Sequence, residues 1–573
     1  MGGACSRKRD QQTQQLIAPK FSKSSSSSSS CSKWRLYNNK TSSFQSLHAP
    51  SLIQLCIQNI LHNYPKSFSI LPRDLSQLIF NHSLLLSHSF NQASLQAFRD
   101  CAIQDICLGD YPGVDDSWLD VICSQGQSLL LLDLSGTDIT DSGLLLLRAC
   151  NNLQDLSLNY CHQVSDKGLH HLNGFSNLTS LSLRKNNSIT ARGIAALVNL
   201  SNLQNLELER CPGIHGGLVH LKGLTKLESL NIRCCNCITD SDMKPLSGLT
   251  SLKELQISCS KVTDSGVAYL RGLNKLVLLN MEGCPVTAAC LGSISALAAL
   301  SYLNLNRCNF SDDGCEKFSG LKNLRVLNLG FNNITDACLV HFKGLTHLES
   351  LNLDSCRIGD EGMFHLAGLL RLKCLELSDT EVGSIGIRHI SGLANLETLN
   401  LSFTVVTDSG LRNLSGLTSL KSLNLDARQI TDTGLVALTG LTFLTHLDLF
   451  GARITDMGTN CLRYFKNLES LEICGGGLSD VGVKNIKDLA SLTLLNLSQN
   501  GNLTDKTLEL ISGLTRLVSL NVSNSRITNA GLQHIKALKN LRSLSLEACT
   551  VTPGEIKKLQ SHYLPNLVSF RPE

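Results

Sequence analysis

Leucines recur through most of the chain as LxxLxL, a six-residue pattern that returns every 24 or 25 residues. Regular copies run from Leu129 to Leu541, an irregular copy begins at Ile103, and a truncated copy begins at Leu567. Alternate side chains of an extended segment point to the same side, so each copy predicts a short strand with its leucines turned inward. Irregular copies at both ends fit a repeat array, whose terminal units must cover the core.

Each predicted strand is followed by a block such as Ile-Thr-Asp-Ser-Gly-Leu at 139–144, and similar blocks occur at 262–267 and 430–435. Thr and Asp side chains accept hydrogen bonds from the first amides of a helix, so the block predicts a capped short helix. One strand and one helix per repeat predict an α/β solenoid over residues 103–573. In this horseshoe a parallel sheet lines the concave side and short helices lie outside.

The first hundred residues have a different pattern. Residues 1–50 are polar and include a serine run at 24–30, so they cannot bury a core and are predicted to be a disordered linker. Residues 51–102 regain apolar residues at helical spacing and predict a small helical module.

Several repeats end their strand in cysteine: Leu-Ser-Leu-Asn-Tyr-Cys at 156–161, and equivalent segments at 206–211, 303–308 and 351–356. In these segments the chain resembles the cysteine-containing class of leucine-rich repeats, typical of F-box and leucine-rich-repeat ubiquitin-ligase receptors. The resemblance covers residues 103–573 and implies a solenoid that recognises other proteins. Later repeats depart from it, as at 399–404, where threonine replaces the cysteine.

Two segments of the module carry a further resemblance. Residues 51–60 resemble the BC-box of elongin-binding receptors, and residues 70–79 resemble both their cullin-box and the opening of an F-box. The resemblance implies an adaptor of the elongin C type or the Skp type as partner. The apolar residues of the first segment recur every four positions and share one helical face, and a proline suits the first turn of the second helix. The predicted adaptor-binding residues are Leu52, Cys56, Ile60, Leu71, Pro72 and Leu75. The alternative is a helical cap over the first repeat, and both can hold.

The chain begins Met-Gly-Gly-Ala-Cys-Ser-Arg-Lys-Arg, which fits the myristoylation pattern with Gly2 as acceptor. One acyl chain binds membranes with an association constant of only about 10⁴ M⁻¹. Palmitoylation of Cys5 and the basic residues nearby would strengthen the anchor. The motif predicts a cytoplasmic protein held peripherally at the plasma membrane, and the alternatives are a chance match or an organelle transit peptide.

Composition narrows the class. The net charge of +4 gives no reason to expect nucleic acid as partner. With no secretory signal, the 23 cysteines are interpreted as reduced thiols.

No nucleotide-binding, metalloprotease or serine-hydrolase motif occurs, so we predict a non-catalytic protein without a cofactor. Cys234 and Cys237 form a CxxC, but no second pair completes a zinc site, and no metal is predicted.

The residue between the second and third leucine is repeatedly asparagine, which predicts a polar stripe on the concave side. Departures from this stripe predict the binding surface for a protein client, because apolar, aromatic and arginine side chains are typical of interface hot spots. They are Leu278, Tyr302, Val326, Arg307 and Phe331. The alternative is that these apolar residues simply pack on one another.

Charge along the concave side is predicted to be dipolar. Basic residues come first, at Arg184, Lys185, Arg210 and Arg233, and acidic residues come later, at Asp354, Glu376, Asp426, Asp448 and Glu472. This distribution favours a partner with both charge signs.

Taken as a whole, the sequence predicts the substrate-binding subunit of a cullin-RING ubiquitin ligase, which directs ubiquitin-dependent degradation. The alternative is a membrane-tethered leucine-rich-repeat scaffold or signalling protein with no ligase connection.

Overall fold

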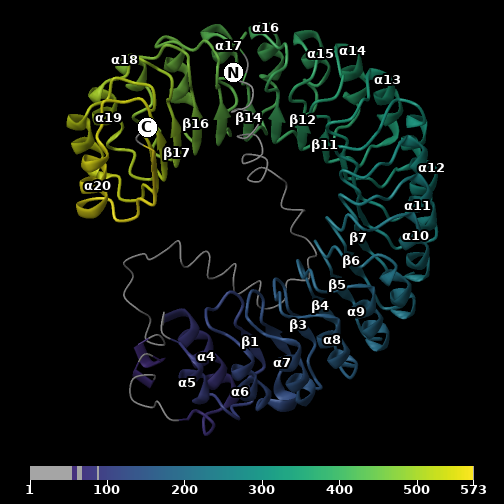
Figure 1. The fold of residues 1–573 in the computed structure, drawn as a ribbon. Helices are drawn as coiled ribbons and strands as arrows, with labels where there is room; N and C mark the ends of the chain where they lie inside the picture. Colours follow the sequence, from purple (N-terminus) through teal and green to yellow (C-terminus); the bar gives the residue numbers. More distant parts are fainter. Residues whose placement is uncertain (1–54, 58, 61–66, 87–89, 427, 572–573) are drawn as a thin grey trace. The chain divides into compact units, whose positions relative to one another are not determined.

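The computed structural model describes residues 55–57, 59–60, 67–86, 90–426 and 428–571 (Figure 1). The chain divides into two compact units, Met1–Cys284 and Pro285–Glu573. Within the described ranges, no helix has both the length and the apolar character needed to cross a bilayer.

The strands of the first unit pair in parallel, each with its neighbour in the sequence. They are β1 (Asp105–Cys107), β2 (Leu131–Asp133), β3 (Asp155–Ser157), β4 (Ser180–Ser182), β5 (Asn205–Glu207), β6 (Ser229–Asn231), β7 (Glu254–Gln256) and β8 (Leu278–Asn280).

The strands of the second unit follow the same rule. They are β9 (Tyr302–Asn304), β10 (Val326–Asn328), β11 (Ser350–Asn352), β12 (Cys374–Glu376), β13 (Thr398–Asn400), β14 (Ser422–Asn424), β15 (His446–Asp448), β16 (Ser470–Glu472), β17 (Leu494–Asn496), β18 (Ser519–Asn521), β19 (Ser543–Ser545) and β20 (Ser569–Arg571).

Short helices lie on the side of each unit opposite the strands (Figure 1). The α-helices of the first unit are α4 (Arg73–Leu86), α5 (Gln92–Gln96), α6 (Leu119–Cys123), α7 (Asp141–Leu146), α8 (Asp166–Leu169), α9 (Ala191–Ala195), α10 (Asp240–Met243) and α11 (Asp264–Val267). Those of the second unit are α12 (Leu291–Ile294), α13 (Asp336–Leu339), α14 (Asp360–Met363), α15 (Ser384–His389), α16 (Asp408–Leu411), α17 (Asp432–Ala437), α18 (Asp480–Val483), α19 (Asp505–Ile511) and α20 (Pro553–His562).

Short 3₁₀-helices complete the same side. In the first unit they are η2 (Asp116–Trp118), η3 (Gly126–Ser128), η4 (Leu147–Ala149), η5 (His170–Leu172), η6 (Ala196–Asn199), η7 (Gly217–Gly223), η8 (Lys244–Gly248) and η9 (Ala268–Leu270). In the second they are η10 (Ala288–Cys290), η11 (Cys315–Gly320), η12 (Val340–Gly344), η13 (Phe364–Leu366), η14 (Arg412–Leu414), η15 (Gly458–Tyr464) and η16 (Asn529–Ala537).

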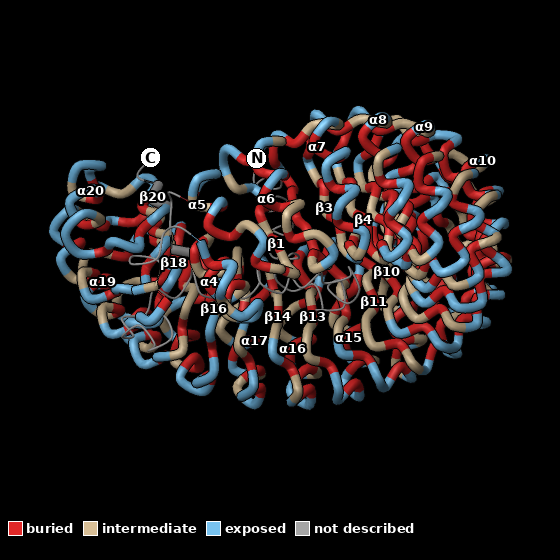
Figure 2. Tube along the Cα trace, turned by 90° about the horizontal axis from the view of Figure 1, so that it is seen from below, coloured by how far each residue is buried: buried red, intermediate tan, exposed pale blue. Residues whose placement is uncertain are grey.

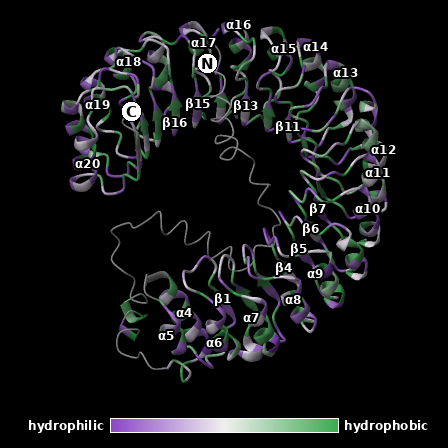
Figure 3. Cartoon of the chain, in the orientation of Figure 1, coloured by the Kyte–Doolittle hydropathy of each residue, from purple (hydrophilic) through white to green (hydrophobic). Residues whose placement is uncertain are grey.

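The core of each unit lies between its strands and its helices. In the repeat of β11, for example, Leu348, Leu351 and Leu353 are fully buried. Figure 2 shows that buried positions recur in every repeat, with exposed positions in the turns between them. Hydrophobic and hydrophilic residues alternate with the same period (Figure 3). The predicted α/β solenoid of parallel strands and short helices is thus confirmed within each unit.

Hydrogen bonds on the helix side link each repeat to the next. Asp141 Oδ1 accepts from Ser165 N (2.7 Å) and Asp141 Oδ2 from Ser165 Oγ (2.6 Å). Ser165 in turn caps α8, because its Oγ accepts from Lys167 N. The aspartates that we interpreted as helix caps therefore act mainly on the following repeat, and the hydroxyl residue supplies the cap.

A glycine completes this link. An added Cβ at Gly168 would overlap the Asp141 carboxylate. The same overlap arises at Gly143, Gly193, Gly266, Gly362, Gly386, Gly434, Gly458, Gly482 and Gly531, each against the aspartate of the preceding repeat. The recurring Thr-Asp-x-Gly block is therefore a packing unit, which we name the Asp–Gly ladder.

The cysteine after the strand forms a second ladder inside the sheet. Cys161 Sγ donates to Leu134 O (3.1 Å), and Cys356 Sγ donates to Leu329 O (3.2 Å). Asn332 takes the same position in another repeat, and its Nδ2 donates to Leu305 O (2.9 Å). Burial raises the pKa of these thiols, to about 11 for Cys161 and about 12 for Cys356, so they remain protonated donors.

The helical module covers the free edge of β1. Gln77 of α4 accepts from Gln104 N (2.9 Å) and Asp105 N (3.0 Å) through Oε1, and its Nε2 donates to Asp105 O (2.7 Å). The side chain thus satisfies groups that a preceding repeat would otherwise pair. Phe80 and Phe98 are buried and pack edge to face at 5.2 Å. The cap that we considered as an alternative for this module is therefore present.

Candidate protein-binding site

Four positions of each repeat lie outside the core on the strand side. They are the first and third residues of the strand and the second and third residues after it. In the repeat of β3 they are Asp155, Ser157, Asn159 and Tyr160. We name these positions the strand face. Leu156 lies between them and is fully buried in the core.

The last strand-face position has a left-handed backbone in nearly every described repeat. Its φ is +60° at Tyr160, +57° at Phe331 and +56° at Phe403, whereas Gly136 and Gly451 occupy it elsewhere. A non-glycine residue there costs roughly 1–2 kcal/mol. The three aromatic rings are nevertheless about 40% exposed (40%, 39% and 41%). These large side chains project outward at a position where glycine would be less strained.

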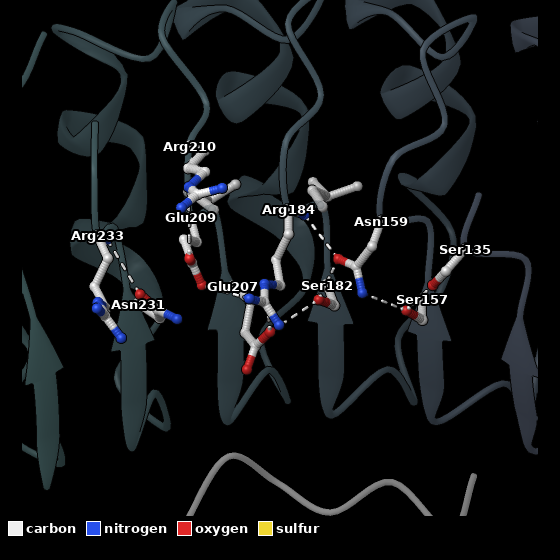
Figure 4. A network of polar contacts seen from close by, with 12 residues as sticks. Ser135, Ser157, Asn159, Ser182, Arg184, Glu207, Glu209, Arg210, Asn231 and Arg233 are labelled. Carbon is white, nitrogen blue, oxygen red and sulfur yellow. Dashed lines mark hydrogen bonds and ion pairs between the residues drawn. The ribbon is translucent and has the colours of Figure 1, made fainter. Parts of the chain in front are cut away.

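A chain of hydrogen bonds crosses β2 to β5 on the strand face of the first unit (Figure 4). Ser135 Oγ lies 2.8 Å from Ser157 Oγ, and Asn159 Nδ2 donates to Ser157 Oγ (2.9 Å). Ser182 Oγ lies 2.6 Å from Asn159 Oδ1 and 3.1 Å from Glu207 Oε2. These contacts hold the side chains in place before any partner arrives.

Two of the four basic residues predicted at this end are joined to glutamates. Arg184 Nη2 lies 2.7 Å from Glu209 Oε2, and Arg184 Nε lies 3.9 Å from Glu207 Oε2. Arg210 Nε lies 3.9 Å from Glu209 Oε1 (Figure 4). The positive charges of Arg184 and Arg210 are thus offset within the first unit, whereas Lys185 lies over the Tyr160 ring and Arg233 Nε donates to Ser258 Oγ. The signal was available in the sequence, because Arg184 and Glu209 take the same position in adjacent repeats.

Three carboxyl groups of this face have a raised pKa, and at Asp105 the cause is burial. Burial, followed by the charges of Asp133, Glu207 and Asp105, raises the pKa of Asp155 to about 7. Burial likewise raises the pKa of Glu254 to about 7. Asp155 and Glu254 are therefore partly protonated at neutral pH, which lowers the negative charge of the first unit.

The structure places four of the predicted partner-binding residues together in the second unit. Tyr302 and Val326 are half-buried and lie opposite each other on β9 and β10. Arg307 Cζ lies 3.9 Å from the centre of the Phe331 ring. Leu278 belongs to the first unit, where it pairs with Glu254. The role of these residues in binding stays a prediction.

The strand face of the second unit is strongly acidic. Among its described residues, the lysines and arginines at these positions are Arg307 and Arg571, the last residue of β20. The acidic residues there are Asp354, Glu376, Asp379, Asp426, Asp448, Glu472 and Glu547. The predicted acidic stretch is therefore present and is longer than expected.

The predicted adaptor-binding residues lie at the module. Leu52 falls outside the described residues. Cys56 and Pro72 are exposed, and Ile60, Leu71 and Leu75 are half-buried. The α4 helix begins at Arg73, directly after Pro72. Its Ile79 is fully buried and belongs to the cap. Gly2 and Cys5 lie outside the described residues, so adaptor binding and acylation both stay predictions.

The CxxC cysteines have separate surroundings. Cys234 is half-buried on the strand face, whereas Cys237 Sγ lies 3.9 Å from Cys211 O. The buried thiol between them belongs to Cys235, which donates to Leu208 O (3.1 Å). Across the described ranges, no group of three or more His, Cys, Asp or Glu is arranged to hold a metal ion.

The chain is similar to several solved structures. An internalin from Listeria monocytogenes is 24% identical, covers 66% of this chain and 94% of its own, and has a TM-score of 0.46. A leucine-rich-repeat protein of Leptospira interrogans is 22% identical over 77% of this chain and 95% of its own (TM-score 0.43). The ectodomain of the Arabidopsis receptor kinase HAESA, solved with a peptide hormone, is 18% identical over 80% and 81% (TM-score 0.42).

No curated protein matches the chain. Two family models do. The model described as leucine-rich repeat region matches residues 305–573. The model described as leucine rich repeat matches residues 127–147, 149–170, 176–198, 223–247 and 248–270. Because the matched segments are the repeats of both units, the chain is a leucine-rich-repeat protein.

Proposed function

We propose that this protein recognises a protein client through its strand face. The observation that carries the proposal is the Arg307–Phe331 pair, an exposed aromatic ring beneath a guanidinium on the strand face. Aromatic and arginine side chains dominate the binding energy of protein interfaces. Neighbouring Tyr302 and Val326 extend the apolar part of this surface.

Charge supports a particular kind of client. The strand face of the second unit carries many carboxylates against Arg307 and Arg571, and Arg184 and Arg210 of the first unit are already joined to Glu207 and Glu209. A client segment that carries Lys or Arg together with an apolar anchor complements this surface. This narrows our expectation of a partner with both charge signs to one whose binding segment is mainly basic.

The test is client capture from cells by the full chain, followed by a binding assay with the captured client. Tyr302→Ala with Phe331→Ala should weaken binding by about thirtyfold, equivalent to about 2 kcal/mol. Phe443→Ala is the matched control, because Phe443 is exposed outside the strand face. Unchanged binding by the double variant would overturn the proposal.

We further propose that the client is delivered to a cullin-RING ubiquitin ligase, with the module as the adaptor-binding part. The support is the resemblance of residues 51–60 and 70–79 to adaptor-binding boxes. In α4, Ile79 and Phe80 are fully buried within the cap, whereas Leu78 is 38% exposed. One helix can therefore close the solenoid and still offer an outer edge to an adaptor.

Co-purification of the full chain with elongin C or with the Skp-type adaptor tests the ligase proposal. Leu52→Ser with Cys56→Phe should abolish the interaction, by removing one apolar anchor and overfilling the pocket of the other. Binding to neither adaptor would leave the alternative, a membrane-tethered scaffold. Gly2→Ala tests the tether, because it removes the amine that myristate would acylate and should move the protein into the soluble fraction.

A further inference from the structure

Two cysteines occupy equivalent strand-face positions in adjacent repeats of the first unit. Cys234 is the third residue after β6 and Cys259 the third after β7, and these strands pair in register. The pairing continues beyond the strands, because Cys234 N donates to Ser258 O (2.8 Å). Adjacent strands lie about 4.8 Å apart. That spacing falls within the range of roughly 4.4–6.8 Å between the Cα atoms of a disulfide.

The two side chains are also neighbours. Both residues have a left-handed backbone, with φ of +57° at Cys234 and +56° at Cys259, so their side chains leave the main chain in the same way. Burial, followed by the neighbouring Cys234 thiol, raises the pKa of Cys259. The next repeat has Gly283 at this position, where an added Cβ would lie 3.5 Å from Cys259 Sγ. The glycine leaves room beside the pair.

Accessibility distinguishes Cys259, the one exposed cysteine among the described residues of the repeats; Cys234 is half-buried, as are Cys107, Cys123, Cys237, Cys374 and Cys549. By contrast, Cys235 and Cys284 are buried and donate to main-chain carbonyls. A small reagent can therefore reach Cys259 without unfolding the repeat.

The second unit offers a buried pair for contrast. Cys315 Sγ and Cys338 Sγ lie 2.7 Å apart, and both residues are fully buried. Their hydrogen bond, followed by burial, raises the pKa of Cys338 far above its ordinary value. These two thiols lie close together, but a reagent in solution cannot reach them in the folded chain.

We propose that Cys234 and Cys259 form a site of reversible thiol oxidation on the strand face, where glutathione disulfide or a similar small disulfide converts the two thiols into one intramolecular disulfide. The Cys259 thiolate attacks one sulfur of the oxidant, whose S–S bond breaks and releases one glutathione. Cys234 then attacks Cys259 Sγ in the mixed disulfide and releases the second. The two cysteines lose two electrons and two protons, and one glutathione disulfide becomes two glutathione thiols. The proposal does not depend on the identity of a client.

The experiment uses the reduced, folded full chain in glutathione buffers of increasing oxidising strength, followed by alkylation of free thiols and tryptic digestion. We expect the peptide 234–253 to become joined to the peptide 254–261 in more than half of the molecules at the most oxidising ratio. Cys315 and Cys338 should still be alkylated once the chain is denatured. Formation should be faster at pH 9 than at pH 7, because the raised pKa of Cys259 keeps little thiolate at neutral pH.

Cysteine-to-serine variants show which two residues form the disulfide. Cys234→Ser and Cys259→Ser should each abolish the joined peptides, whereas Cys237→Ser, in the same tryptic peptide, should retain them. Joined peptides that persist in Cys234→Ser would place the bond on another cysteine and overturn the proposal. So would their absence at every glutathione ratio, or their appearance only in urea.

Discussion

The two sides of each repeat are built by different rules. On the helix side the Asp–Gly ladder repeats with little change, so that Asp408 bonds to Thr431 N (2.8 Å) and Thr431 Oγ1 (2.5 Å) just as Asp141 bonds to Ser165. On the strand face the equivalent positions hold Tyr160, Phe331 or glycine. The repeated side fixes the stacking of repeats, and the varied side is free to carry recognition.

This difference separates stability from binding. Substitutions in the Asp–Gly ladder should unfold the solenoid without depending on any client. Substitutions of exposed strand-face residues such as Phe331 should leave stability nearly unchanged. The free energy of unfolding, measured by urea denaturation, distinguishes the two.

The largest effect is expected for Gly434→Ala. In an ordinary helix this change gains up to about 1 kcal/mol, but here the new Cβ would overlap the Asp408 carboxylate. We expect a loss of about 2 kcal/mol, typical of overpacking. Gly440→Ala is the matched control, because its Cβ would meet only Ser415 O at 3.8 Å.

A slightly smaller loss is expected for Asp408→Ala. It removes both bonds to Thr431 and leaves a partly buried amide without its acceptor, at a cost of about 1–2 kcal/mol. The exposed Asp488 provides the control, as Asp488→Ala. In the double variant Asp408→Ala/Gly434→Ala the overlap with the carboxylate disappears. The loss in the double variant should therefore be smaller than the sum of the two single losses by about 1 kcal/mol. Strict additivity would argue against the ladder.

A pH-dependent effect of about 1 kcal/mol is expected for Asp155→Asn. Folding raises the pKa of Asp155 from its ordinary 3.8 to about 7, so the folded state holds the proton more tightly than the unfolded state between these values. This carboxyl therefore favours folding at low pH and loses that contribution as pH rises through 7. Relative to wild type, Asp155→Asn should be more stable at pH 8 than at pH 4. The size is reduced because the group is partly solvated. A difference that does not change with pH would contradict the raised pKa.

The smallest change in stability is expected for Phe331→Ala. It removes an exposed ring and its contact with Arg307, which is worth about 0.5 kcal/mol at such a site. Urea denaturation should barely distinguish this variant from Phe443→Ala, although only Phe331→Ala should weaken the client. A loss comparable with that of Gly434→Ala would show that Phe331 belongs to the core and would remove the distinction between the two sides.

The sequence by itself determined the repeat, the inward leucines and the position of each short helix. These follow from periodicity alone, because one strand and one helix recur within each period. It also marked the cysteine after the strand as a recurring position, and Cys161 and Cys356 are buried donors in the structure. The burial of Leu156 and its equivalents could be predicted from the local sequence pattern alone.

The tertiary structure decided which residues meet across repeats. Periodicity shows that Asp141 recurs, but not that its carboxylate reaches Ser165 and excludes a side chain at Gly168. The sequence places Arg184 and Glu209 at the same position in adjacent repeats, but only the stacking shows that their side chains meet, at 2.7 Å. No sequence signal identifies Gln77 as the residue that caps β1. A hydrogen bond between segments about 28 residues apart depends on how the chain folds back on itself. A single repeat specifies its own shape, and contacts between repeats depend on the stacking that only the folded chain provides.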